Sequence, residues 1–250
     1  MSATSTTIVV PCFDEAGRLD PDGLRQLACL AGARIHLVDD GSTDGTAAAL
    51  AALVAADPAT FAVTTLATNR GKAEAVRVGL LAALDDGAAI VGYYDADLAT
   101  PPVEMARLVD VLRDDPALQV VLGSRVALLG TAIDRSPPRH YVGRLFATAS
   151  SLILDMTVYD TQCGAKVLRA GPALRAALTT PFHSRWAFDV ELLGRLHGGG
   201  GGVAGLPTSA FREEPLAAWH DRRGSKLGPV AALRAAWDLV AVARAVRSGP

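Results

Sequence analysis

Short apolar runs alternate with helical segments through the first half of the chain, and this alternation is what most constrains the fold. Five runs have the β-branched and apolar character of buried strands, at 7–10, 35–38, 61–66, 88–94 and 119–122. Between them lie segments with helical spacing or alanine-rich composition, at 21–30, 43–56, 72–84 and 102–113. This βαβα order predicts an α/β fold with a mainly parallel, doubly wound sheet. Ligands of such sheets bind beyond the carboxyl ends of the strands.

The second half is less regular. We expect a helix over 144–154, a turn and strand over 160–168, and another helix over 185–196. Five consecutive glycines at 198–202 indicate a surface loop, because no Gly-Lys-Ser/Thr sequence follows them to form a phosphate cradle.

Composition limits the class of protein. The 250 residues are half hydrophobic with a net charge of −2, which fits one globular domain or two fused halves and gives no reason to expect nucleic-acid binding. Cys12, Cys29 and Cys163 are too few for a disulfide framework or a structural zinc site, so we expect reduced, buried thiols. Residues 1–11 lack a basic region, and no window reaches the ~20 apolar residues of a spanning helix. We therefore expect a cytoplasmic protein, soluble or peripheral at a membrane.

Polar residues gather directly after four of the predicted strands. The clusters lie at 11–15, 39–44, 69–72 and 95–97. Because parallel strands end at the same edge of the sheet, we expect all four clusters in one crevice. The alternative for a single cluster is that its Asp or Ser caps the next helix, as Ser42 or Asp44 could.

Asp95 and Asp97 form a D-x-D pair where a buried strand ends. Paired carboxylates suit a hard divalent cation such as Mg²⁺ or Mn²⁺, which takes phosphate oxygens as further ligands. Without a cation, a carboxylate about 4 Å from a diphosphate would be repelled by roughly 4 kcal/mol. The pair therefore predicts a metal ion, or nearby Lys and Arg, and a nucleotide diphosphate ligand.

Four segments together resemble the family 2 glycosyltransferases with the GT-A fold: TIVVPCFDEAGRL, VDDGSTDGT, NRGKAEAVRVGL and YDADLATPP. In the second half GSRV, DTQCGAKVLRA, RWAFDVELL and GSKL resemble the dolichyl-phosphate β-glucosyltransferase branch, a relative of the polyprenyl-phosphate sugar synthases. The resemblance covers about 6–228. It implies a GT-A domain over 1–228, with a nucleotide-sugar-binding half at 1–115 and an acceptor half at 116–228. The residues beyond it, 229–250, are predicted from their own pattern to form a C-terminal amphipathic helix.

The resemblance also implies where the donor binds. The nucleoside would contact Pro11, Phe13 and Glu15, and Asp40 would read its base. The sugar diphosphate and metal would be held by Lys72, Asp95, Ala96 and Asp97, of which Asp95 and Asp97 bind the metal. Asp14 departs from the family by replacing a usual asparagine.

The resemblance further implies basic residues near the two phosphates. Arg125 and Lys226 match positions near the diphosphate and the acceptor phosphate. His220 approaches the phosphates or the metal, or is a surface imidazole. Acceptor binding would use Arg135, Arg139 and Arg144, whose guanidinium groups suit bidentate phosphate recognition, unless these lie in a solvated loop.

The implied reaction is inverting transfer of a hexose, glucose from UDP-glucose, to a polyprenyl phosphate. An ionised phosphate acceptor makes a strong general base unnecessary, so three roles stay open for Asp189 and Glu191: base, sugar ligand, or partner of basic side chains. Two other functions stay open as well, the glycosylation of a soluble acceptor and non-catalytic nucleotide binding. The sequence leaves the oligomeric state open.

The C-terminal segment is basic and amphipathic. From Arg222 onward it holds six basic residues and one acid, with an apolar stripe at helical spacing formed by Val230, Leu233, Trp237 and Val240. Such a helix lies in a membrane interface or docks on the core or on a partner subunit. Peripheral contact at the inner face of a membrane is one expectation.

Overall fold

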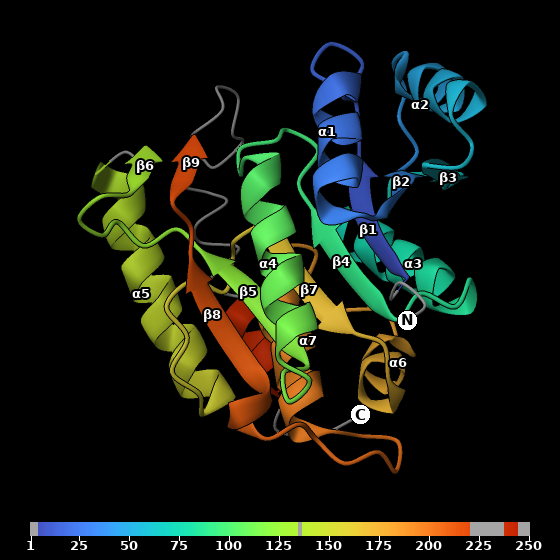
Figure 1. Cartoon of the computed structure of the whole chain (residues 1–250). Helices are drawn as coiled ribbons and strands as arrows, with labels where there is room; N and C mark the ends of the chain where they lie inside the picture. Colours follow the sequence, from blue (N-terminus) through green and yellow to red (C-terminus); the bar gives the residue numbers. More distant parts are fainter. Residues whose placement is uncertain (1–4, 135–136, 221–237, 245–250) are drawn as a thin grey trace.

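The computed structural model describes residues 5–134, 137–220 and 238–244, except for the side chains of 137–142 (Figure 1). One seven-stranded sheet has the order β3-β2-β1-β4-β7-β5-β8, and only β7 runs antiparallel to its neighbours β4 and β5. Its strands are β1 (Thr6–Cys12), β2 (Arg34–Asp39), β3 (Phe61–Thr65), β4 (Ile90–Tyr94), β5 (Val120–Ser124), β7 (Ala165–Arg169) and β8 (Phe211–Pro215). A separate parallel pair joins β6 (Ala132–Asp134) and β9 (Ala218–His220). The predicted α/β class with a mainly parallel sheet is confirmed.

Helices cover both faces of this sheet (Figure 1). The chain contains α1 (Pro21–Ala31), α2 (Thr46–Ala56), α3 (Lys72–Asp85), α4 (Pro102–Asp114), α5 (Pro137–Leu154), α6 (Pro172–Leu178), α7 (Phe188–Gly198) and the 3₁₀ turn η1 (Thr208–Ala210). Alternate residues of β1 face opposite ways, so Ile8 and Val10 join a core with α1 and α4, whereas Val9 joins a core with α3, α6 and α7. Strands buried on both faces are therefore apolar throughout, which is the pattern seen in the sequence.

Two helices begin later than their sequence pattern predicts, and side-chain hydrogen bonds explain both. Residues 43–45 form a turn in which Asp44 accepts from the backbone N–H of Thr46, so α2 starts at Thr46 and not at 43. Ser184 Oγ likewise accepts from the N–H groups of Trp186 and Ala187, so α7 starts at Phe188 and not at 185. In contrast, α5 begins at Pro137, ahead of the predicted 144.

One expectation about the cysteines is wrong. Cys12 and Cys163 are buried, but Cys29 is exposed. The inward face of α1 is formed by Leu24, Leu27, Ala28 and Ala31, and the helical spacing turns residue 29 away from it.

Part of the predicted C-terminal helix is described. Residues 238–244 are helical, and Leu239 and Val242 pack into the core shared with α7. Asp238 accepts a hydrogen bond of 2.7 Å from Ser184 Oγ, which ties this helix to the turn before α7. Val240, from the predicted apolar stripe, is 44% exposed, and the other stripe residues lie outside the described residues.

Candidate active site

The four strand-end clusters are joined to one another by hydrogen bonds and an ion pair. Asp14 Oδ1 accepts from the N–H of Thr43 at 2.8 Å, which joins the first cluster to the second. Asp40 accepts from the N–H groups of Arg70 and Gly71, each at 2.7 Å, which joins the second to the third. Lys72 Nζ lies 2.5 Å from Asp95 Oδ1 and joins the third to the fourth. The predicted convergence at the carboxyl edge of the sheet is present.

Asp40 holds the loop between β3 and α3. Its carboxylate is almost fully buried and also accepts from Asn69 Nδ2 at 3.0 Å. Gly41 beside it has a φ of +68°, and a Cβ there would lie 2.5 Å from the Thr68 carbonyl carbon, so this position requires glycine. Asp40, the predicted base-reading residue, is therefore fixed in place by its hydrogen bonds to this loop.

The segment that follows β1 carries the predicted nucleoside contacts. Pro11 lies within β1, and Phe13 and Glu15 follow it, all three half-buried. The N–H of Glu15 donates to Thr46 Oγ1 at 2.8 Å, which fixes this segment to the start of α2. The Glu15 carboxylate is paired with Arg18 at 2.7 Å.

The turn after β4, residues 95–99, presents the two acids and is called the acidic turn below. Asp95 donates its N–H to the Gly164 carbonyl at 3.1 Å, Ala96 is buried, and Asp97 Oδ1 accepts from the N–H of Ala99 at 3.0 Å. Burial raises the pKa of Asp97, and the neighbouring charge of Asp95 raises it further. The pair thus favours the arrival of a cation.

Lys72 supplies a side-chain cation at the acidic turn. Burial alone would lower its pKa, but attraction to Asp95, Asp189 and Asp97 outweighs this and raises the pKa, so the ammonium stays charged. The side chains of Lys72 and Asp95 are each 37% exposed, so both can reach a ligand.

Gly164 supports Asp95 from behind and was not predicted as a site residue. A Cβ at this position would lie 1.8 Å from Asp95 Oδ2, so only glycine leaves room for the carboxylate. The signal lay in the DTQCGAK segment, where a glycine directly precedes a strand. The reason for it could not be read, because Asp95 is distant in sequence.

Asp189 lies in a buried polar set behind the acidic turn. It is 4% exposed, accepts from the Tyr93 hydroxyl, and pairs with Lys166 Nζ at 2.6 Å. Burial, followed by the charge of Asp189, raises the pKa of Tyr93 well above its usual value, so its hydroxyl remains a donor. Sequence reasoning missed Tyr93 and Lys166, although a lysine inside an apolar strand is the signal of a buried cation.

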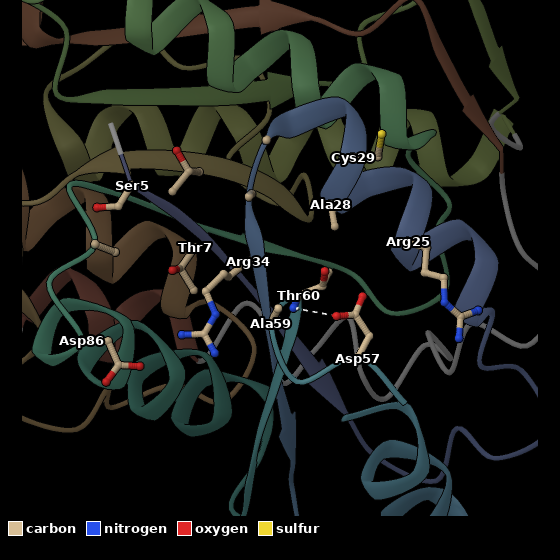
Figure 2. A pocket seen from close by; sticks show the side chains of 14 residues that line it. Ser5, Thr7, Arg25, Ala28, Cys29, Arg34, Asp57, Ala59, Thr60 and Asp86 are labelled. Atoms are coloured by element: carbon tan, nitrogen blue, oxygen red, sulfur yellow. Dashed lines mark hydrogen bonds between the residues drawn. The ribbon is translucent and has the colours of Figure 1, made fainter. Parts of the chain in front are cut away.

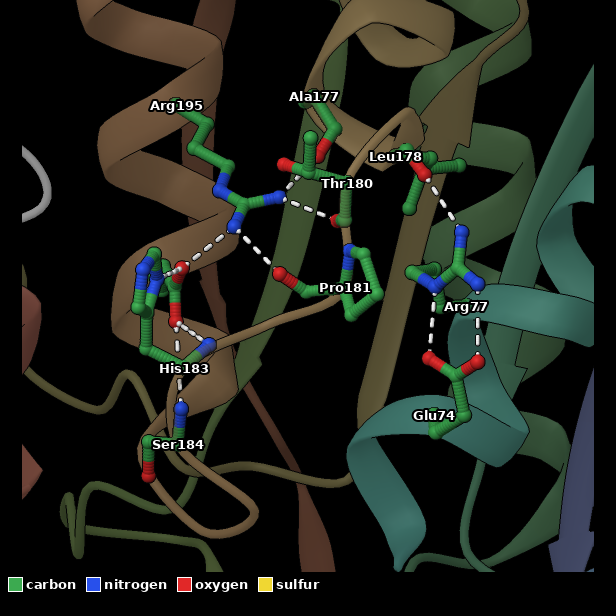
Figure 3. Close-up of polar contacts among 10 residues, drawn as sticks. Glu74, Arg77, Ala177, Leu178, Thr180, Pro181, His183, Ser184 and Arg195 are labelled. Carbon is green, nitrogen blue, oxygen red and sulfur yellow. Dashed lines mark hydrogen bonds and ion pairs between the residues drawn. The ribbon is translucent and has the colours of Figure 1, made fainter. Parts of the chain in front are cut away.

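Glu191, for which the sequence left three roles open, pairs with two basic side chains. Its carboxylate is fully buried, accepts from Arg195 at 2.6 Å, and lies 2.7 Å from His183 Nδ1. Arg195 also donates to the carbonyls of Ala177, Thr180 and Pro181, which holds the turn between α6 and α7 (Figure 3). Glu191 is therefore a partner of basic side chains.

The turn between α6 and α7 also contacts the loop between β3 and α3, which Asp40 holds. Arg185 donates to the Asn69 carbonyl at 3.2 Å, and its side chain covers Gly71. Arg77 on α3 donates to the Leu178 carbonyl at 2.9 Å and pairs with Glu74 (Figure 3). These contacts fix the α6–α7 turn to α3, the helix that begins with Lys72.

Arg125 directly follows β5 and forms an ion pair with Asp160. It makes two side-chain hydrogen bonds to the Asp160 carboxylate, at 2.7 and 2.8 Å, and its guanidinium lies 5.4 Å from the Trp219 ring. Burial alone would lower its pKa, but the charge of Asp160 more than offsets this and raises it. Arg144 on α5 stacks 4.2 Å from the ring of Tyr159, the residue before Asp160. Sequence reasoning missed Asp160, a charged residue at the start of the DTQCGAK segment.

Other predicted residues divide by what the structure describes. His220 is exposed, and its N–H donates to the Ala99 carbonyl at 2.9 Å, which places β9 beside the acidic turn. Arg135 and Lys226 lie outside the described residues, as does the side chain of Arg139. Among the described helices, none combines the length and apolar character needed to cross a bilayer.

The acidic turn fits a metal ion that is bound jointly by protein carboxylates, substrate phosphates and water. Within the described ranges no group of three His, Cys, Asp or Glu side chains forms a metal cage. Mg²⁺ rarely uses such a cage in nucleotide enzymes, because one or two carboxylates bind it together with substrate phosphates and water. Asp95 and Asp97 supply those carboxylates, and Gly164 leaves room for one of them.

A cavity of about 620 Å³ lies elsewhere, at the amino ends of the strands (Figure 2). Its lining includes Ser5, Arg34 and Thr60, which start or precede β1, β2 and β3. In a parallel sheet this edge is opposite to the ligand-binding edge, so the cavity is separate from the acidic turn.

A doubly wound sheet with joined acidic and basic clusters at its carboxyl edge is typical of α/β proteins that bind a ligand at this edge. Residues 7–173 match the family model "Glycosyl transferase family 2". The chain belongs to this family, and the predicted glycosyltransferase resemblance is confirmed.

Two relatives align over most of the chain. It is 33% identical over 244 residues to a dolichyl-phosphate beta-glucosyltransferase of Drosophila melanogaster, covering 89% of this chain and 69% of the relative. It is 26% identical over 211 residues to a polyprenol monophosphomannose synthase of Mycolicibacterium smegmatis, covering 84% and 78%.

A solved structure gives the same fold. Glucosyl-3-phosphoglycerate synthase from Mycobacterium tuberculosis, in complex with Mn²⁺, UDP and glucosyl-3-phosphoglycerate, superposes with a TM-score of 0.70. The two are 19% identical, and the match covers 100% of this chain and 82% of that one. The GT-A fold class is thereby confirmed.

Proposed function

We propose that this glycosyltransferase moves a hexose, glucose from UDP-glucose, to a polyprenyl phosphate with inversion at the anomeric carbon. The cluster of Lys72, Asp95 and Asp97 at the carboxyl edge carries the proposal, because it joins a cation to two acids where a sugar diphosphate would bind. The relatives named as dolichyl-phosphate glucosyltransferase and polyprenol monophosphomannose synthase support a polyprenyl phosphate as the acceptor.

Asp95 and Asp97 would hold a Mg²⁺ or Mn²⁺ ion, whose charge would stabilise the departing UDP. The fold neighbour in complex with Mn²⁺ and UDP supports this assignment. Lys72 would donate to the diphosphate, since its ammonium already lies at the acidic turn. Pro11, Phe13, Glu15 and Asp40 would contact the nucleoside.

The acceptor phosphate would approach from the side of β5 and α5. Arg144 would contact it, together with Arg135, Arg139 and Lys226. His220, beside the acidic turn, would approach the phosphates or the metal. Arg125 would act mainly by positioning, because Asp160 occupies two of its donors. A phosphate oxygen is ionised near neutral pH and can attack the anomeric carbon without losing a proton. This reaction therefore needs no general base.

The division of the chain follows from this assignment. Residues 1–115 would bind the nucleotide sugar and 116–228 the acceptor, with 229–250 as a C-terminal helix. Its basic, amphipathic composition supports peripheral contact at the inner face of the membrane.

The proposal is tested by incubating the protein with UDP-glucose, other nucleotide sugars and a polyprenyl phosphate, with Mg²⁺ or Mn²⁺, and detecting products by mass spectrometry. We expect a polyprenyl-phosphate hexose that extracts into organic solvent. Asp97→Ala should lower the rate at least 100-fold, whereas the matched surface variant Asp22→Ala, whose side chain is 93% exposed, should keep it.

Two outcomes would replace the proposal. A product that extracts only into water would indicate a soluble acceptor. Failure to bind or turn over any nucleotide sugar would indicate a non-catalytic nucleotide-binding protein. Full activity of Asp97→Ala would remove the metal assignment.

A further inference from the structure

A buried lysine lies behind the acidic turn and has no part in the proposed reaction. Lys166 on β7 is 0% exposed. Its ammonium donates to Asp189 Oδ1 and to the Cys163 carbonyl, each at 2.6 Å, and lies 5.1 Å from the Tyr93 ring. A charge in the core strongly opposes folding unless it is paired and hydrogen-bonded. Asp189, Cys163 and Tyr93 together meet this need.

The two hydrogen bonds connect separate parts of the site. Cys163 immediately precedes Gly164, which packs against the Asp95 carboxylate and accepts the Asp95 N–H at 3.1 Å. Asp189 lies in the first turn of α7. Lys166 therefore ties the backbone that supports Asp95 to the first turn of α7.

Asp189 accepts a second hydrogen bond, from Tyr93. The oxygen that accepts from Lys166, Oδ1, also accepts from the Tyr93 hydroxyl. Tyr93 lies two residues before Asp95 on β4. Two donors from neighbouring strands thus share this one carboxylate oxygen. The arrangement is that of a counter-ion.

We propose that Lys166 is a positioning residue for donor binding: its simultaneous bonds to Cys163 and Asp189 hold Gly164 against Asp95 and so fix the carboxylate on which the metal and nucleotide depend. Asp189 is its counter-ion. This inference rests on the proposed function, in which Asp95 contributes to binding of Mn²⁺ and UDP.

The test uses the double variant Lys166→Met/Asp189→Asn. Removing one partner alone would leave a buried unpaired charge, but replacing both leaves none, so the double variant should fold with a Tm within about 5 °C of wild type. Titration calorimetry then measures binding of UDP in the presence of Mn²⁺. We expect 10–100-fold weaker binding, the usual effect of losing a group that orients a metal ligand.

Arg175→Met/Asp85→Asn is the matched control, because it also removes both partners of an ion pair. Asp85 is the last residue of α3, whereas Lys72 is the first, so this pair is remote from the acidic turn and UDP affinity should stay within about threefold of wild type. The inference is overturned if the folded Lys166→Met/Asp189→Asn variant binds UDP and Mn²⁺ as wild type does, or if the control weakens binding equally. If the wild-type protein binds UDP and Mn²⁺ as poorly as Asp97→Ala does, the proposed function and this inference are overturned together.

Discussion

Lys72 Nζ lies 2.5 Å from Asp95 Oδ1, so a side-chain ammonium occupies an oxygen of the carboxylate assigned to the metal. A divalent ion that arrives at Asp95 must compete with this ammonium. The diphosphate that arrives with it gives Lys72 a new partner. Lys72 therefore affects binding of the metal alone and binding of the nucleotide in opposite directions.

Replacing Lys72 with Met should separate these two effects. Mn²⁺ alone should bind about fivefold more tightly, because a half-exposed ion pair contributes about 1 kcal/mol and no longer competes. UDP in the presence of Mn²⁺ should bind at least fivefold more weakly, because a charge-assisted contact to phosphate is lost. Calorimetry measures both constants. Changes of the same sign would mean that Lys72 does not exchange partners.

Gly164→Ala tests the packing behind Asp95. The new Cβ would overlap the carboxylate at 1.8 Å, so Asp95 must turn away from its present position. We expect UDP affinity with Mn²⁺, and transfer activity, to fall at least tenfold. Gly171→Ala is the control, because a Cβ there meets nothing within 4 Å and φ is −179°. Equal activity of the two variants would contradict the packing argument.

Much of the fold follows from the sequence because strands buried on both faces carry an unbroken apolar signal. The run from Ile90 to Tyr94 is entirely buried, and it was predictable for that reason. β8 was not predicted, since its sequence FREEP is charged and it takes its place only by pairing with β5 at the sheet edge. The antiparallel direction of β7 likewise depends on the partners β4 and β5, which local pattern does not encode.

The site divides in a similar way. Asp95 and Asp97 were predictable because two acids at a strand end are chemically unusual. Gly164 and Lys166 were not, because their roles depend on Asp95 and Asp189, which are distant in sequence and adjacent only after folding. Arg125 was assigned to phosphates from its motif, and only the structure reveals its bidentate pairing with Asp160.

The stability of the protein should depend on pH through His36. This side chain is 6% exposed on β2 and its Nε2 lies 2.9 Å from Thr64 Oγ1. Burial lowers the pKa of His36, Asp86 partly opposes this, and Arg34 lowers the pKa further. The unfolded chain, with a histidine pKa of about 6.5, therefore binds more protons below that pH, and stability is lost as the pH falls.

Denaturant unfolding between pH 7.5 and 5 measures this effect. His36 should contribute a slope of up to about 1.4 kcal/mol per pH unit to the free energy of unfolding. His36→Gln should remove that part of the slope and leave the contribution of the other histidines. Equal slopes for wild type and variant would show that His36 is protonated equally in both states.

Thiol labelling should distinguish the three cysteines. Burial, followed by the charges of Glu15 and Asp39, raises the pKa of Cys12 to about 12, and burial raises that of Cys163 to about 11. At pH 8 both thiols stay protonated and shielded, and only the thiolate reacts with a disulfide reagent. Cys29 is exposed. Native protein should therefore release one equivalent of reporter quickly, and denatured protein three. Cys29→Ser should abolish the fast phase, and a fast phase that persists in this variant would mean that the core around Cys12 or Cys163 opens readily.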